Sequence, residues 1–484
     1  MDQSRAPYFE ALRAYADVER TVFHVPGHIQ GKGSHSLLVE AFGAGTLELD
    51  LCSGLPGLDG RPGTALERAE ALAAAAYGAD RSWFLINGST SGNQILVSAV
   101  CHPGEVILTP RNTHKSIISA LVVSGARPVY ITPEIDPGSH IAHGVTPAAV
   151  QAGLRAHPEA KAVLIVSPTY YGACSDVAGI ARVVHDHGLP LLVDEAWGPH
   201  FPFHPELPAP ALTLGADASV TGTHKLAGAL TQAAMLHVRG PLIDHDRVDV
   251  VSKMLLSTSP SCLLYAALDV ARMQMATEGE ELLQETLRLA GTAQTVIRAH
   301  PRLSCIDKTL IGAYGVVGLD PTRLCVNVTA TGHTGYEVER LLCESHGVMA
   351  EMSDFANVLF NITIGHGQGA VDRLLDALAA VADLRPHPVD PHGFLESGLL
   401  TIPEQVLSPS EAFHAPQTRV PLGESAGLVS AELAASYPPG IPVVVPGERL
   451  TRPLVDHLLA QVAAGCRIVG SRDHRLRTIQ VVRE

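Results

Sequence analysis

Short apolar runs alternate with amphipathic runs through much of the chain. Four apolar runs are typical of buried strands, at 105–109, 128–132, 162–167 and 189–194. The runs between them carry apolar residues at helical spacing, at 114–124, 147–156 and 177–187. This rhythm predicts an α/β protein with a central, mostly parallel sheet that is covered by helices on both faces.

The pattern continues on both sides of this region. Helices are expected at 5–17 and 64–77, and a strand at 83–87 precedes a Gly/Ser/Thr turn and a helix at 95–100. A helical stretch at 262–289 leads to a second alternating region, with strands at 323–329 and 358–364 and helices at 336–345 and 370–384. A proline-rich linker at 385–392 precedes a third unit, whose last helix is capped by Thr451 and ends near Gly465. We therefore expect an N-terminal arm (1–40), a large domain (41–290), a smaller α/β domain (291–384) and a C-terminal α+β domain (393–484).

Length and composition narrow the class of protein. A chain of 484 residues is too long for one core. We expect neither a membrane span nor a signal peptide, and the eight scattered cysteines predict reduced thiols of a cytoplasmic protein without a metal site. The formal net charge of −15 argues against nucleic-acid binding and is compatible with a small cationic substrate.

Two glycines enclose three hydroxyl residues directly after the strand at 83–87. Ser89, Thr90 and Ser91 lie between Gly88 and Gly92, at the expected start of a helix. Free backbone N–H groups and hydroxyls at such a position form a seat for an anion. The alternative is an ordinary helix cap, but the three hydroxyls favour phosphate binding.

A second group of residues adds a candidate reactive lysine. Lys225 follows His224 after a β-prone run, and Asp194 ends the apolar run Leu-Leu-Val-Asp. A phosphate seat, an acid at a strand end and a lysine fit pyridoxal phosphate, which needs a lysine as its carrier and an acid beside its ring nitrogen. Ala196 is placed to lie against one ring face and His114 against the other. Each signal alone is more often structural, and their combination makes the prediction specific.

Several motifs together carry a resemblance to a known family. They are Phe-His-Val-Pro-Gly-His, Asn-Gly-Ser-Thr-Ser-Gly-Asn, Arg-Asn-Thr-His-Lys-Ser, Pro-Thr-Tyr-Tyr-Gly, Asp-Glu-Ala-Trp-Gly-Pro-His, Thr-His-Lys, Ser-Thr-Ser-Pro-Ser and Tyr-Pro-Pro-Gly-Ile-Pro-Val-Val-Val-Pro-Gly-Glu. The chain resembles the Orn/Lys/Arg decarboxylase family from about residue 23 to 470, in its short bacterial form. The resemblance implies a fold type I, aspartate aminotransferase-like enzyme that depends on pyridoxal phosphate.

The resemblance also implies roles for matching residues. Lys225 would carry the cofactor as a Schiff base, with Asp194 at the ring nitrogen and His114 on the ring. The remaining cofactor-binding residues would be Ser89, Thr90, Ser91, Ala196, Trp197, Thr221, Thr223 and His224. Glu448 and His28 are candidates for substrate binding, although the loop of His28 could equally pack on a neighbouring subunit. Thr258 and Ser259 would lie near the site of a neighbour, which implies a homodimer or a larger homo-oligomer.

Two positions depart from the family pattern. Gly222 stands where relatives have Ser, which removes a hydroxyl that Thr221 could replace, and Ile29 stands where members often have Lys. The implied reaction is decarboxylation of arginine, lysine or ornithine to the corresponding amine and CO₂, with a role in polyamine biosynthesis. His224 or Lys225 would return a proton to Cα. Transamination, cyclisation or elimination on a guanidino or diamino acid is the alternative. A partner-binding relative without cofactor is a third reading, which the intact Lys225, Asp194 and His114 disfavour.

Overall fold

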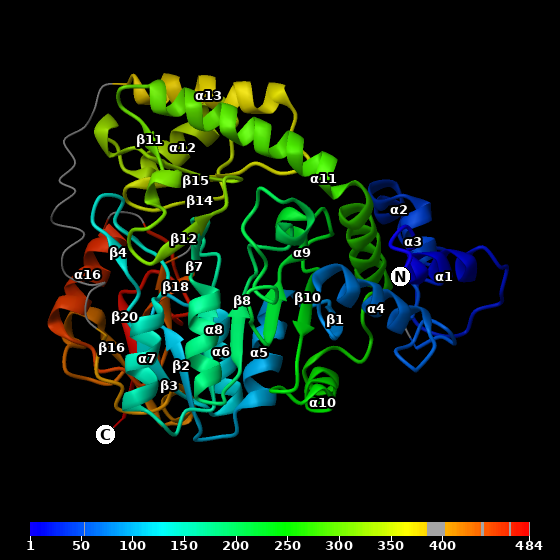
Figure 1. The fold of residues 1–484 in the computed structure, drawn as a ribbon, viewed down its shortest axis with the longest axis horizontal. Coiled ribbons are helices and arrows are strands. Elements are labelled where there is room, and N and C mark those ends of the chain that lie inside the picture. Colours follow the sequence, from blue (N-terminus) through cyan, green and yellow to red (C-terminus); the bar gives the residue numbers. More distant parts are fainter. Residues whose placement is uncertain (53, 385–401, 437–439, 464–465, 484) are drawn as a thin grey trace.

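The computed structural model describes residues 1–52, 54–384, 402–436, 440–463 and 466–483. The predicted linker at 385–392 lies outside these residues. The chain begins with four helices at one end of the molecule (Figure 1), namely α1 (Pro7–Ala16), α2 (Ser36–Phe42), α3 (Ala44–Leu49) and α4 (Ala65–Tyr77). Helix α1 is not a free arm, because its Tyr8 and Leu12 are buried in a cluster with residues of α4 and of the long helix α11 (Cys262–Ala299).

A seven-stranded sheet forms the centre of the molecule. Its strand order is β1-β10-β9-β8-β6-β2-β3. The bounds are β1 (Arg81–Leu85), β2 (Val106–Pro110), β3 (Arg127–Ile131), β6 (Ala162–Val166), β8 (Leu191–Asp194), β9 (Ala218–Thr221) and β10 (Ala234–Val238). All neighbouring strands are parallel except those that pair with β10, which runs antiparallel to both β1 and β9. The prediction of a mostly parallel sheet is therefore confirmed.

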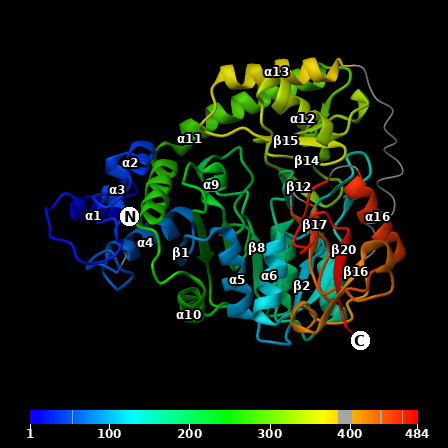
Figure 2. The same cartoon turned by 180° about the vertical axis from the view of Figure 1, so that it is seen from behind.

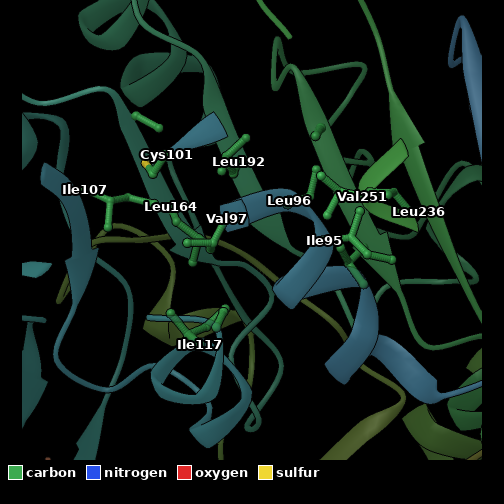
Figure 3. Packing of buried hydrophobic residues seen from close by; sticks show 14 of the residues in the cluster. Ile95, Leu96, Val97, Cys101, Ile107, Ile117, Leu164, Leu192, Leu236 and Val251 are labelled. Atoms are coloured by element: carbon green, nitrogen blue, oxygen red, sulfur yellow. The ribbon is translucent and has the colours of Figure 1, made fainter. Parts of the chain in front are cut away.

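Helices cover both faces of this sheet. Leu164 and Leu192 pack in one cluster with α5 (Gly88–Val100), α6 (Lys115–Ser124) and α10 (His245–Leu255), as Figure 3 shows for several of these side chains. Val163 and Val193, which alternate with them along the strands, pack on the other face with α7 (Pro147–Ala156) and α8 (Val177–Asp186). Near-continuous apolar strands arise because both faces are buried.

Two helices extend further than the sequence pattern indicates. Helix α5 begins at Gly88 and not at 95, so the Gly/Ser/Thr run is its first turn. Helix α11 continues to Ala299, ten residues beyond the predicted end at 289, because Ala290, Ala293 and Ile297 pack in the next core. Tertiary packing of a buried face thus extends this helix, and α11 joins the two halves of the molecule (Figure 1).

A second, smaller sheet lies above the first in Figure 1. Its order is β11-β13-β15-β14, all antiparallel, with α12 (Gly335–His346) and α13 (Gln368–Ala382) packed on it. The strands are β11 (Ser304–Cys305), β13 (Arg323–Asn327), β14 (Met352–Ser353) and β15 (Asn357–Asn361). Strand β12 (Val316–Leu319) leaves this unit and pairs with β7 (Ala173–Ser175) of the first half, which ties the two units together. A small hairpin of β4 (Ile135–Asp136) and β5 (Ile141–Ala142) extends from the large sheet.

The C-terminal residues form two further small sheets beside β2 (Figure 1 and Figure 2). Their elements are α15 (Pro409–His414), β16 (Gln417–Pro421), β17 (Ala434–Ser436), β18 (Ile441–Val444), α16 (Arg452–Ala463), β19 (Ile468–Val469) and β20 (Thr478–Val482). The Thr451 hydroxyl accepts a hydrogen bond from the Leu454 N–H, which confirms the predicted cap of α16. Within the described residues no helix is long and apolar enough to cross a membrane. The fold class is as predicted, and the exact domain boundaries stay predictions.

Candidate active site

A cavity of about 610 Å³ lies where the carboxyl ends of the central strands face the smaller sheet. Ligands of parallel α/β sheets collect at this edge. Eight of the predicted site residues line the cavity: Ser89, Thr90, His114, Asp194, Ala196, Trp197, His224 and Lys225. The other lining residues are Asn87, Gly88, Val166, Tyr170, Thr231, Gln232, Glu351, Met352 and Asn361.

The first turn of α5 forms the polar end of the cavity. Gly88 has a φ of +69°, which turns the chain from β1 into the helix, and a helix start leaves its first N–H groups without a partner within the helix. An added Cβ on Gly92 would come within 2.7 Å of Val220 and 2.8 Å of Leu85, so this glycine lets the helix start lie close to the sheet. Ser89 and Thr90 line the cavity, whereas Ser91 is buried and donates its hydroxyl proton to the Gly88 carbonyl.

Lys225 lies on the short helix α9 (Thr223–Leu226), directly after β9. Its Nζ is 3.8 Å from the ring centroid of Trp197. Burial lowers the pKa of Lys225 to about 8; Asp194 opposes this shift and Arg323 adds to it. A lysine with so low a pKa is partly neutral near physiological pH, as a nucleophilic amine must be.

Gly222 allows Lys225 to approach the neighbouring backbone closely. An added Cβ at this position would come within 2.7 Å of the Ala196 carbonyl oxygen and 3.1 Å of the Lys225 Cδ. A serine at position 222 would therefore clash with the backbone of Ala196 in this structure. The replacement hydroxyl suggested for it, that of Thr221, is 3.1 Å from the His237 Nε2 and does not line the cavity.

Asp194 ends β8 and is 4% exposed. Its Oδ2 accepts a hydrogen bond of 2.8 Å from the Asn93 Nδ2, and its Oδ1 accepts one of 3.2 Å from the Ala196 N–H. Burial raises the pKa of Asp194, while the charge of Lys225 and these two donors oppose the rise. The carboxylate is thus held in place with acceptor capacity to spare.

The two histidines of the cavity differ in their hydrogen bonds. The His224 Nδ1 lies 2.9 Å from the Ala233 carbonyl oxygen, so it carries the proton and leaves Nε2 as an acceptor. The His114 Nδ1 instead faces the Ser116 hydroxyl at 2.7 Å. Burial lowers the pKa of His114 to about 3, with a further lowering by Lys225, so this ring is neutral.

Three other predicted residues lie off the cavity wall. Thr223 is buried beside His224, and its Oγ1 has no hydrogen-bond partner among the described residues. His28 contacts Asp50 at 3.2 Å, within the N-terminal segment. Glu448 is fully buried and accepts hydrogen bonds from Arg111 and from the Val445 N–H. His28 and Glu448 do not line the cavity of their own chain, and their roles in substrate binding stay predictions.

Sequence reasoning missed several residues around the site. Glu351 and Asn361 reach the cavity from the smaller sheet, and the Asn361 Nδ2 donates to the Glu351 carboxylate at 2.7 Å. Arg323 is buried, lies 3.7 Å from the Trp197 ring centroid and donates to the Tyr170 carbonyl. No local motif marks these positions. Their role depends on how the two sheets meet, which the hydrophobic pattern does not encode.

Comparison with known proteins settles the family. The model of the Orn/Lys/Arg decarboxylase major domain matches residues 6–370, and that of its C-terminal domain matches residues 394–470. The chain belongs to the Orn/Lys/Arg decarboxylase family. It is 39% identical to an arginine decarboxylase of Bacillus subtilis over 486 residues, which cover 100% of this chain and 99% of the relative. The predicted activity, decarboxylation of a basic amino acid, is thereby confirmed.

More distantly similar lysine decarboxylases share the fold. A lysine decarboxylase of Pseudomonas aeruginosa, LdcA, is 26% identical over 93% of this chain and 75% of its own length. The solved structure of lysine decarboxylase A from Pseudomonas aeruginosa has a TM-score of 0.85 at 23% identity, covering 99% of this chain and 80% of that one. The lysine decarboxylase LdcF of Francisella novicida has a TM-score of 0.84 at 21% identity, covering 99% of this chain and 81% of that one.

Proposed function

We propose that this decarboxylase binds pyridoxal phosphate on Lys225 and converts arginine to agmatine and CO₂. The observation that carries the proposal is the meeting of Lys225, Asp194 and the first turn of α5 in one cavity. Arginine is favoured over lysine because the arginine decarboxylase of Bacillus subtilis is similar over its whole length, whereas LdcA is less similar and longer.

The chemistry of the cavity fits the cofactor. The Ser89 Oγ, the Tyr170 hydroxyl and the Trp197 Nε1 are buried and have no hydrogen-bond partner among the described residues. Each unpaired buried polar group costs about 1–3 kcal/mol, so a polar ligand that pairs with them would be stabilised. A phosphate at the start of α5 would meet Ser89, Thr90 and the free N–H groups of the helix.

Pyridoxal phosphate, when bound, supplies an electron sink for the pair left as the bond from Cα to the carboxylate breaks. Asp194 would keep a proton on the ring nitrogen by its negative charge. Ala196 and His114 would hold the two ring faces. The amine of Lys225 and the ring of His224 both lie at the cavity wall. The protonated amine of Lys225 can return a proton to Cα directly, whereas His224 can do so only after its Nε2 has accepted one.

Glu351 is the candidate for recognising the distal cation of the substrate. Among the described lining residues, the only carboxylates are Asp194 and Glu351. Glu351 is exposed, and the Asn361 amide donates to one of its oxygens, Oε2. A guanidinium can pair with such a carboxylate through a charge-assisted hydrogen bond. Glu351 thus takes over the substrate role that the sequence assigned to Glu448.

We further propose that a second copy of this chain completes the assembly. Apolar side chains of the N-terminal segment are strongly exposed, among them Phe23 at 95%, Leu37 at 69% and Phe42 at 61%. Thr258 and Ser259 are also exposed in the single chain. A homodimer would cover these side chains and bring Thr258 and Ser259 near the partner's site. A cytoplasmic location and a role in polyamine formation belong to the same proposal.

The test is a substrate panel. The purified protein with added pyridoxal phosphate is incubated with arginine, lysine or ornithine, and amine and CO₂ are both quantified. We expect agmatine and CO₂ in equal amounts, with arginine giving the highest kcat/KM. Preference for lysine or ornithine would overturn the assignment of arginine, and a keto acid without CO₂ would favour the transamination alternative.

The same panel tests Glu351. Glu351→Gln keeps the size of the side chain and the acceptor for Asn361 but removes the charge, and we expect KM for arginine to rise roughly tenfold. Glu404→Gln is a matched control, because Glu404 is an exposed glutamate that pairs with Arg449 away from the cavity. An unchanged KM in Glu351→Gln would contradict the role of Glu351.

A further inference from the structure

Two buried side chains connect His114 to Asp194 behind the cavity wall. The Asn93 Nδ2 lies 2.8 Å from the Asp194 Oδ2 and 2.9 Å from the Ser116 Oγ, and the Ser116 Oγ lies 2.7 Å from the His114 Nδ1. Asn93 and Ser116 are each 1% exposed and do not line the cavity. The four side chains therefore form a continuous hydrogen-bonded chain with little access for water.

The donors of this chain point in one direction. An ionised carboxylate can only accept, so Asp194 orients the Asn93 amide with its NH₂ group inward. The second hydrogen of that group is donated to Ser116, whose own hydroxyl proton is then free for His114. The Ser116 backbone N–H also donates to the His114 Nδ1, at 3.2 Å. Both donors require an unprotonated Nδ1, and a neutral ring then carries its proton on Nε2.

We propose that Asn93 and Ser116 are positioning residues that transmit the ionised state of Asp194 to His114 and fix its proton on Nε2. The inference rests on the proposed function, because it places His114 and Asp194 on the same cofactor. It also distinguishes the two cavity histidines, since His114 offers a donor whereas the Nε2 of neutral His224 is an acceptor. Of the two rings, only His224 is set to receive a proton through Nε2.

The tautomer of His114 is measurable without substrate or cofactor. Protein labelled with ¹⁵N-histidine gives distinct signals for protonated and unprotonated ring nitrogens, and His114→Asn identifies the signals of His114 by their loss. We expect the proton on Nε2 in the wild type, and a larger share on Nδ1 in Ser116→Ala and Asn93→Ala. Ser116→Thr keeps the hydroxyl and should retain the wild-type ratio.

A double-mutant cycle tests whether the two residues act as one unit. With cofactor and substrate, Ser116→Ala and Asn93→Ala should each lower kcat/KM roughly tenfold, the scale typical of groups that orient a ligand-contacting residue. The double variant should fall to about the same level and not to the product of the two losses. Thermal melting of each variant separates this loss from unfolding.

Three results would overturn the inference: a wild-type His114 protonated on Nδ1, a tautomer ratio that neither alanine variant changes, or losses that multiply in the double variant. The first two results are independent of the proposed function, because the ¹⁵N measurement needs neither cofactor nor substrate. If the wild type decarboxylated none of the three amino acids, the proposed function would fail, whereas the ¹⁵N measurement would still decide the role of Asn93 and Ser116.

Discussion

Asp194 and Glu448 are both buried carboxylates beside a cation, yet their surroundings differ. Glu448 faces Arg111, whose Nε and Nη2 lie 3.1 and 3.0 Å from its two oxygens, and it also accepts from the Val445 N–H at 2.8 Å. Asp194 has one amide donor, one backbone donor and the charge of Lys225. Burial raises the pKa of both carboxyls, and the neighbouring cation opposes the rise in each case.

The difference lies in what remains unpaired nearby. Around Asp194 the Ser89, Tyr170 and Trp197 polar atoms have no partner among the described residues, and they border an open cavity. Arg111 instead donates two further N–H groups to the Pro442 and Val443 carbonyls. A fully paired acid joins two parts of the fold, whereas an acid among unpaired groups is prepared for a ligand.

The largest effect should come from Lys225. Lys225→Ala removes the only lysine that lines the described cavity, and we expect kcat to fall roughly a thousandfold or more because both the carrier amine and a proton donor are lost. Product amine from arginine is the measurement. Lys253→Ala, at an exposed lysine of α10, is the control and should retain activity. Substantial activity in Lys225→Ala would contradict the assignment of the cavity around Asp194 and Lys225 as the active site.

The next test replaces each of the two buried acids in a separate variant. Asp194→Asn should lower kcat by roughly 10²–10³, the scale for removing a fixed electrostatic group, while the melting temperature changes little. Glu448→Ala should instead lower the stability of the fold. It leaves the buried charge of Arg111 without its partner, which costs about 3–5 kcal/mol of unfolding free energy. Denaturant unfolding and kcat, measured on both variants, check the contrast. Equal effects of the two substitutions on kcat and on the unfolding free energy would contradict the different roles of Asp194 and Glu448.

The pH dependence of cofactor uptake tests the lowered pKa of Lys225. The pKa is lowered from 10.5 to about 8, so the neutral amine that attacks an aldehyde is half formed near pH 8. The rate at which cofactor-free protein takes up pyridoxal phosphate should therefore rise about tenfold per pH unit below this value and level off above it. Stopped-flow absorbance measures the rate. A rise that continues to pH 10 would indicate an unshifted lysine.

Gly222 should give the smallest effect. In Gly222→Ser the new Cβ would meet the Ala196 carbonyl oxygen at 2.7 Å, so the backbone around Lys225 must shift at a cost of about 1–3 kcal/mol. We expect weaker cofactor binding, seen as a higher Kd in fluorescence titration. Gly291→Ser is the control, because an added Cβ there meets nothing within 4 Å. Tighter binding in Gly222→Ser would mean that the added hydroxyl outweighs the steric cost.

Local sequence signals predicted the fold better than the contacts between its parts. Helix α7 and strand β6 follow from periodicity alone. The order of the motifs predicted a common site for Lys225, Asp194 and His114, and the structure places all three at one cavity. The extension of α11 could not be predicted, because it depends on packing with distant residues. The burial of Glu448 away from the cavity could not be predicted for a similar reason, because its partner Arg111 lies 337 positions earlier in the chain.

The proposed function requires that the cofactor is bound to Lys225. The most direct measurement treats the protein loaded with pyridoxal phosphate with borohydride, which fixes the bond, and locates the added mass by peptide mass spectrometry. We predict one modified site, at Lys225, and no stable label in Lys225→Ala. A label on another lysine, or none in the wild type, would contradict the account.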